Sequence, residues 1–119
     1  MATSDAEHRK QAGAHQVAAA FLAKLSGTYD VAQAILFGSR ARGDHHPDSD
    51  LDLAIVLNGA RADFIDTKLD MAGIAFDVLM ETGVLVQPFP LWDGDLAYPE
   101  RFTNPALIRT IAQYGIRLG

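Results

Sequence analysis

A glycine junction between two apolar segments constrains this chain more than any other feature. Residues 32–37, Ala-Gln-Ala-Ile-Leu-Phe, are apolar enough to predict a short buried strand that stops at Gly38. Gly38 permits backbone angles and close approaches that other residues resist. Residues 39–43, Ser-Arg-Ala-Arg-Gly, then predict a tight turn or the first turn of a helix.

The residues of this turn are suited to binding an anion. Backbone N–H groups at the start of a helix, together with the Ser39 hydroxyl, suit phosphate oxygens. Arg40 and Arg42 add positive charge, and Gly43 lets the chain leave at a steep angle. An ordinary strand-turn-helix junction has a similar composition, so this half of the pattern does not decide the function alone.

A pair of aspartates follows Ser39 after ten intervening residues. Residues 49–57, Ser-Asp-Leu-Asp-Leu-Ala-Ile-Val-Leu, predict a strand whose leucines and isoleucine face the core. Asp50 and Asp52 then share the other face with Ala54. Two adjacent carboxylates repel each other unless a cation lies between them, and Mg²⁺ prefers such oxygen ligands. A solvated strand end is the alternative interpretation.

A third acid lies in another apolar segment. Residues 74–80, Ile-Ala-Phe-Asp-Val-Leu-Met, predict a strand with Asp77 at its centre. Burying a charge there is costly unless it is paired or bound to a metal. If this strand lies beside the Asp50–Asp52 strand, Asp77 completes a cluster of three carboxylates. The alternative is that Asp77 faces solvent on a half-exposed sheet.

These residues together resemble a known family. Gly38-Ser39, ten residues, Asp50-Leu51-Asp52 and the later Asp77 are similar to the signature of the minimal nucleotidyltransferases of the DNA polymerase beta superfamily. The resemblance covers the chain from about residue 35 to residue 80. It implies an α/β (α+β) fold, a short mixed sheet flanked by helices, and nucleotidyl transfer that uses two Mg²⁺ ions and ATP as substrate.

The resemblance also implies a role for each residue of the motif. Gly38 and Ser39 would hold the β- and γ-phosphates, with Arg40, Arg42 and Gly43 as further nucleotide-binding residues. The metal ligands and catalytic residues would be Asp50, Asp52 and Asp77. Asp77 would bind the metal on the attacking side and help deprotonate the acceptor hydroxyl. Two metals stabilise both the entering and the leaving oxygen of such a displacement.

Composition narrows the class of protein. We expect residues 1–119 to form one domain, because the chain is short and 49% of its residues are hydrophobic. The chain has no cysteine, no membrane-length apolar run and no signal-peptide pattern, so we expect a cytoplasmic protein. A net charge of −5 disfavours a nucleic acid as direct ligand, because such proteins usually present a basic surface.

The flanking segments predict a scaffold. We expect a helix from a capping box at residues 4–7 to about Leu25, a helix over residues 62–72 that stops at Gly73, and a strand over residues 84–87 broken by Pro88. A last helix should begin at Asn104-Pro105 and bury Leu107, Ile108, Ile111 and Tyr114. We interpret Lys68 as part of a solvated helix face and Asp93-Gly94-Asp95 as a turn.

The acceptor is not identified by the residues themselves. Only about forty residues follow Asp77, so an open face or a second chain must bind the acceptor. The resemblance implies a partner: many minimal nucleotidyltransferases pair with a small helical protein of the HEPN type, transfer AMP to that ribonuclease toxin and act as its antitoxin. A hetero-oligomer or a homodimer is then expected. Two alternatives are an enzyme that modifies a small-molecule hydroxyl with a second subunit, and an antitoxin that binds its partner without catalysis.

Overall fold

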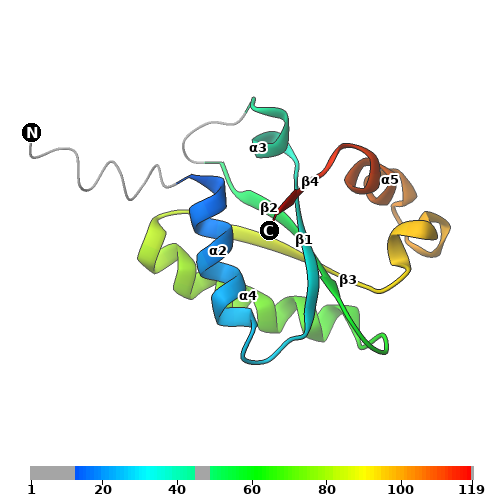
Figure 1. Cartoon of the computed structure of the whole chain (residues 1–119), viewed down its shortest axis with the longest axis horizontal. Coiled ribbons are helices and arrows are strands. Elements are labelled where there is room, and N and C mark those ends of the chain that lie inside the picture. Colours follow the sequence, from blue (N-terminus) through cyan, green and yellow to red (C-terminus); the bar gives the residue numbers. More distant parts are fainter. Residues whose placement is uncertain (1–12, 45–48, 119) are drawn as a thin grey trace, which may run out of the picture.

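The computed structural model describes residues 13–44 and 49–118 (Figure 1). Its centre is a four-stranded mixed sheet in the order β3-β2-β1-β4. Strand β2 pairs with β1 in antiparallel and with β3 in parallel, and β4 lies antiparallel to β1 at the other edge. The elements are α2 (Ala14–Leu25), β1 (Val31–Phe37), α3 (Ser39–Arg42), β2 (Leu51–Leu57), α4 (Phe64–Thr82), β3 (Val86–Trp92), η1 (Asp95–Ala97), η2 (Pro99–Arg101), α5 (Pro105–Tyr114) and β4 (Ile116–Leu118).

Helices cover both faces of this sheet. Helices α2 and α4 lie on one face, and α5 with the two 3-10 turns lies on the other (Figure 1). Strand β2 shows the division most clearly, because Leu51, Leu53, Ile55 and Leu57 pack with α2 and α4 while Ala54 and Val56 pack with α5. Alternation along a strand therefore places Asp52 on the α5 face together with Ala54, and a shared face for Asp52 and Ala54 was predicted from the sequence.

Helix α2 ends at Leu25, as predicted, and buries Val17, Ala18, Phe21 and Leu25. Polar contacts join the C-terminal end of α2 and the loop after it to α4. Lys24 forms an ion pair with Glu81, with Nζ and Oε1 2.9 Å apart, and the Tyr29 hydroxyl donates to Asp70. The capping box expected at residues 4–7 lies outside the described residues.

The segment from residue 62 to residue 82 differs from the expectation. Helix α4 continues through Gly73 to Thr82 and ends at Gly83, whose φ is 78°, so the strand predicted over residues 74–80 is wrong. Met71, Ala75 and Val78 are buried at helical spacing against the sheet, whereas Phe76 and Met80 are exposed. The stabilisation from this buried face exceeds the cost of about 1 kcal/mol for glycine inside a helix.

The C-terminal half differs from two expectations. The strand predicted over residues 84–87 with a break at Pro88 is wrong, because β3 covers Val86–Trp92 and passes through Pro88 and Pro90. Prolines are possible there because an edge strand uses only one of its hydrogen-bonding sides. Helix α5 begins as predicted, with the Asn104 side chain accepting from the Leu107 N–H. It buries Ile108 and Ile111, but Tyr114 is 70% exposed, so its predicted place in the core is wrong. None of the described helices is long and apolar enough to cross a membrane.

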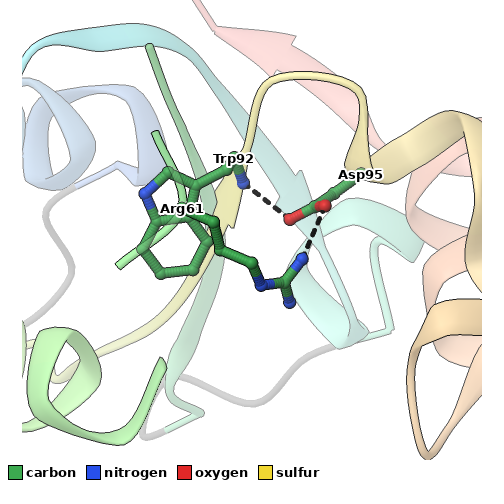
Figure 2. A network of polar contacts seen from close by, with 3 residues as sticks. All are labelled: Arg61, Trp92 and Asp95. Atoms are coloured by element: carbon green, nitrogen blue, oxygen red, sulfur yellow. Dashed lines mark hydrogen bonds and ion pairs between the residues drawn. The ribbon is translucent and has the colours of Figure 1, made fainter. Parts of the chain in front are cut away.

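An arginine and a buried aspartate fasten the loop before α4 to the end of β3 (Figure 2). One oxygen of Asp95 accepts from Arg61 Nη1 at 2.8 Å, and the other accepts from the Trp92 backbone N–H at 2.8 Å. The Arg61 guanidinium also lies 5.4 Å from the Trp92 ring centroid and 5.2 Å from that of Phe102. The interpretation of residues 93–95 as a structural turn is confirmed, because Asp95 is buried and both its oxygens are used within the protein.

Candidate active site

The glycine junction brings both halves of the sequence motif together. Strand β1 ends at Phe37, Gly38 has φ 75° and ψ −155°, and α3 follows at once, ending at Gly43. A Cβ atom added at Gly38 would lie 2.2 Å from Oδ2 of Asp52. Glycine is therefore required at this position for two reasons, the positive φ and the closeness of the carboxylate. The turn after β1 and the carboxylate of β2 form one continuous site.

The two aspartates of the motif lie at the start of β2 in different environments. Asp50 is exposed just before the strand, while Asp52 is partly buried and pairs in register with Phe37 of β1. Burial raises the pKa of Asp52, and the negative charge of Asp50 raises it further. The charges of Lys68 and Arg42 act in the opposite direction on the same pKa. Two acids and two bases thus interact at this end of the sheet.

Asp77 is not placed with this pair, contrary to the prediction. It lies on α4, its side chain is exposed, and its charge acts on Lys24 of α2. The expected cluster required a strand at residues 74–80, but this segment is part of helix α4. Within residues 13–44 and 49–118, no group of three or more His, Cys, Asp or Glu side chains is arranged to hold a metal ion.

Gln87 occupies the place beside the pair that a third acid was expected to fill. It lies in β3 directly opposite Asp52 in the parallel register. Its Nε2 donates a hydrogen bond to Oδ2 of Asp50, 3.0 Å away. Gln87 lies at the end of the strand predicted over residues 84–87 but is not among the predicted site residues. The signal that could have found it is a lone polar side chain in an apolar strand next to the aspartate strand.

The two arginines of the turn have different contacts. Arg40 donates from Nε and Nη2 to the backbone oxygen of Ser49, at 3.2 and 3.0 Å, and so joins the two ends of the segment between α3 and β2. Arg42 pairs with Asp44, with Nε and Oδ2 3.2 Å apart, and its charge reaches Asp52. Arg42 is therefore the better placed of the two for an anion beside the carboxylates.

Lys68 belongs to the site, although it was interpreted as part of a solvated helix face. Its Nζ donates to the backbone oxygen of Pro88 at 2.9 Å and lies 5.7 Å from the Phe89 ring centroid. These contacts place the ammonium group of Lys68 beside the edge strand β3. From there its positive charge lowers the pKa of Asp52. Helical periodicity does not predict this contact, because the long Lys68 side chain extends beyond the helix face to which it is attached.

A cavity adjoins the glycine turn on the side of α5. It has a volume of about 340 Å³ and is lined by Phe37, Gly38, Ala41, Arg42, Thr110, Tyr114 and Gly115. Most of these groups are apolar or aromatic, and Arg42 connects the cavity to the carboxylates. Tyr114 lies here, which explains why its ring is exposed and not part of the core.

The residues at this site suit one divalent cation. Asp50 and Asp52 supply the anionic oxygen ligands that Mg²⁺ prefers. The missing Cβ of Gly38 leaves the Asp52 carboxylate accessible, because any larger residue there would overlap its oxygen. A nucleotide polyphosphate is the natural second ligand, because Mg²⁺ is commonly held by one or two carboxylates together with substrate phosphates.

Comparison with known proteins agrees with this geometry. The family described as "Nucleotidyltransferase domain" matches residues 17–118. A solved structure from Sulfolobus solfataricus, described as a candidate nucleotidyltransferase, has a TM-score of 0.54 over 87% of this chain and 86% of that chain, at 22% identity. At that identity the likeness shows the fold alone, and it confirms the predicted mixed sheet flanked by helices. None of the curated proteins matches the chain.

Proposed function

The chain belongs to the nucleotidyltransferase domain family, and from that premise we propose that it transfers AMP from ATP to a hydroxyl group of a partner protein. The proposed partner is a small helical ribonuclease of the HEPN type, which this chain would silence as an antitoxin. The observation that carries the transferase assignment is the approach of Gly38 to Asp52. It places the turn that would hold the phosphates beside a carboxylate that would bind the metal.

The proposed reaction is a substitution at phosphorus. The acceptor oxygen forms a bond to the α-phosphorus of ATP, the bond from that phosphorus to the bridging oxygen breaks, and pyrophosphate leaves with the electron pair. The proton of the acceptor hydroxyl passes to water. Mg²⁺, when bound, would neutralise phosphate charge and polarise the α-phosphoryl group.

The chain's own residues would position the triphosphate. Asp50 and Asp52 would hold Mg²⁺ with the phosphates, and Gly38 with the Ser39 hydroxyl would contact the β- and γ-phosphates. Arg42 and Lys68 add positive charge next to Asp52, which supports binding of a polyanion there. Arg40 would act indirectly, by holding Ser49, the residue before Asp50, next to α3.

The outward face of α4 supports a helical protein partner. Ile65, Leu69, Phe76 and Met80 follow one another at spacings of four, seven and four residues, and each is more than half exposed. Apolar residues at such spacing pack against a helix of a partner. Asp66 and Asp77 flank the same face and are exposed, so we expect basic residues beside the partner's apolar stripe.

The transfer is tested with ATP labelled at the α-phosphate, Mg²⁺ and a lysate of the source cell. Wild type is compared with Asp50→Ala and with Asp93→Ala, which removes an exposed acid of the turn after β3. A labelled small protein that appears with wild type and Asp93→Ala, but not with Asp50→Ala, supports the proposal. Label on a small molecule instead would favour the small-hydroxyl enzyme.

The partner face is tested by a separate pair of variants. Leu69→Asp introduces a charge into the exposed stripe, whereas Arg109→Asp changes an exposed residue of α5 on the other side of the sheet. We expect Leu69→Asp to lose capture of the labelled protein and Arg109→Asp to keep it. Capture that survives Leu69→Asp contradicts the α4 face. A loss of self-association in that variant, with no helical partner, indicates a homodimer.

One observation favours a second candidate function, an antitoxin that binds its partner without catalysis. Gln87 stands where the family resemblance predicted a third carboxylate, so the site lacks an acidic group on that side. Full neutralisation of the partner by Asp50→Ala would support this alternative. Loss of neutralisation in the same variant, with partner binding retained, would exclude it.

A further inference from the structure

The amide of Gln87 lies where an additional metal ligand could lie. Its Nε2 is 3.0 Å from Oδ2 of Asp50, and its Cα is in register with that of Asp52. Neighbouring oxygen ligands of an octahedral Mg²⁺ are about 2.8–3.0 Å apart, because each metal–oxygen bond is about 2.0–2.1 Å long. The position of Nε2 is thus compatible with a shared ligand shell, but an N–H donor directed at Asp50 does not bind a cation.

Charge at the site also favours a single cation. Asp50 and Asp52 together carry two negative charges, which one divalent cation balances. Lys68 and Arg42 already place two positive charges near Asp52. A second divalent cation would meet this positive charge without a third carboxylate to offset it. The described residues offer no other cluster of acids that could supply one.

We propose that Gln87 restricts the site to one divalent cation per bound nucleotide and positions Asp50 as a ligand of that cation. This inference rests on the proposed nucleotide site at Asp50 and Asp52. The hydrogen bond from Gln87 fixes the Asp50 carboxylate through Oδ2, and Oδ1 has no hydrogen bond to any residue that the structure describes. Replacing the amide with a carboxylate of the same length creates the third anionic ligand, and with it a second cation site.

The experiment counts bound Mn²⁺, used in place of Mg²⁺, by equilibrium dialysis of the full chain with α,β-methylene-ATP, an analogue that cannot transfer AMP. We expect about one Mn²⁺ per bound nucleotide for wild type and about two for Gln87→Glu. Gln113→Glu makes the same charge change at an exposed position of α5 and should stay at about one. Gln87→Asp serves as a second variant if Gln87→Glu folds poorly.

The outcomes separate this inference from the proposed function. Two Mn²⁺ per nucleotide in wild type, or one in both Gln87→Glu and Gln87→Asp, overturns the role of Gln87. Asp52→Asn should lose the bound Mn²⁺ with a drop of about tenfold or more in affinity. If Asp52→Asn instead keeps the wild-type affinity, the nucleotide site itself is misplaced and the proposed function fails first.

Discussion

Asp52 and Asp95 are both carboxylates at the ends of strands, yet their surroundings differ in kind. Asp95 is 3% exposed, and its two oxygens accept from Arg61 and from the Trp92 N–H. Asp52 has no ion-pair partner in the part of the chain that the structure describes, and burial together with Asp50 raises its pKa. The first carboxylate is satisfied within the fold, and the second is suited to a ligand from outside.

The difference shows how a small domain separates stability from function. A buried charge is retained when the protein supplies its partners, and removing one partner is then costly. A carboxylate with a raised pKa is held in its charged form against the preference of its environment, a pattern found at functional sites. The comparison predicts that substitutions at Asp52 change activity without unfolding the chain, and that substitutions at Asp95 do the reverse.

The largest expected effect is on catalysis. Asp52→Asn keeps the shape of the side chain but removes the charge that would hold the cation, so we expect AMP transfer to fall about 10³-fold or more, equal to about 4 kcal/mol of transition-state stabilisation. The measurement is the rate of α-label transfer beside the thermal midpoint of unfolding. Asp93→Asn, at an exposed turn, should leave both unchanged.

Transfer by Asp52→Asn within about tenfold of the wild-type rate would contradict the comparison directly. A loss of transfer that is accompanied by a large loss of stability would also contradict the predicted contrast between Asp52 and Asp95. In that case Asp52 would support the fold as Asp95 does.

Gly38→Ala tests the link between the turn and Asp52. The new Cβ would lie 2.2 Å from Oδ2 of Asp52, at a backbone φ of 75° that alanine disfavours. We expect transfer to fall about 10²-fold because the carboxylate must move, and stability to fall by about 1–2 kcal/mol. Steady-state kinetics and urea unfolding measure the two effects.

A matched glycine provides the control. Gly73 lies inside α4, and a Cβ there would meet no atom within 4 Å. Gly73→Ala should therefore raise stability by up to about 1 kcal/mol and leave transfer unchanged. Equal responses to the two substitutions would mean that neither the positive φ of Gly38 nor its closeness to Asp52 is required.

Asp95→Ala tests whether Asp95 contributes to stability and not to transfer. It leaves the Trp92 N–H and Arg61 without their acceptor, so we expect the free energy of unfolding to fall by about 2–3 kcal/mol. Transfer by the fraction that remains folded should be unchanged within about twofold. Urea unfolding gives the first value, and kinetics below the unfolding transition give the second. Arg101→Ala, which removes only a cation over the Tyr98 ring, should cost less.

The sequence predicted the site best where short-range chemistry determines the structure. The apolar run before Gly38 predicted the strand that ends there. The alternation around Asp52 predicted a second strand and the face on which Asp52 lies, because side chains alternate between the two faces of a strand. The strand predicted over residues 74–80 is wrong, because this segment belongs to α4. Its apolar residues satisfy either period, and packing of Met71, Ala75 and Val78 on the sheet selects the helix.

The helical conformation of the segment around Asp77 also decides which residues form the strand beside β2. Once α4 includes Asp77, the strand beside β2 must come from residues 86–92, and the side chain opposite Asp52 is then Gln87. Pairing between β2 and β3 depends on contacts across more than thirty residues of chain. Local pattern marks Gln87 as a lone polar residue in a strand, but it does not encode this pairing, so the place of Gln87 beside Asp52 could not be read from spacing.

The smallest expected effect is on the pH dependence of stability. Because the pKa of Asp52 is raised above its ordinary value of 3.8, the folded chain binds this proton more tightly than the unfolded chain. The ionised carboxylate therefore destabilises the fold once the pH exceeds the raised pKa, and it has no such effect below pH 3.8. Asp52→Asn removes the charge, so its Tm should exceed that of wild type slightly at pH 7, and the gap should close on acidification. Thermal melts of both proteins across this range, without Mg²⁺, measure the gap. A gap that widens as the pH falls would mean that ionised Asp52 stabilises the fold, and the contrast with Asp95 would then be lost.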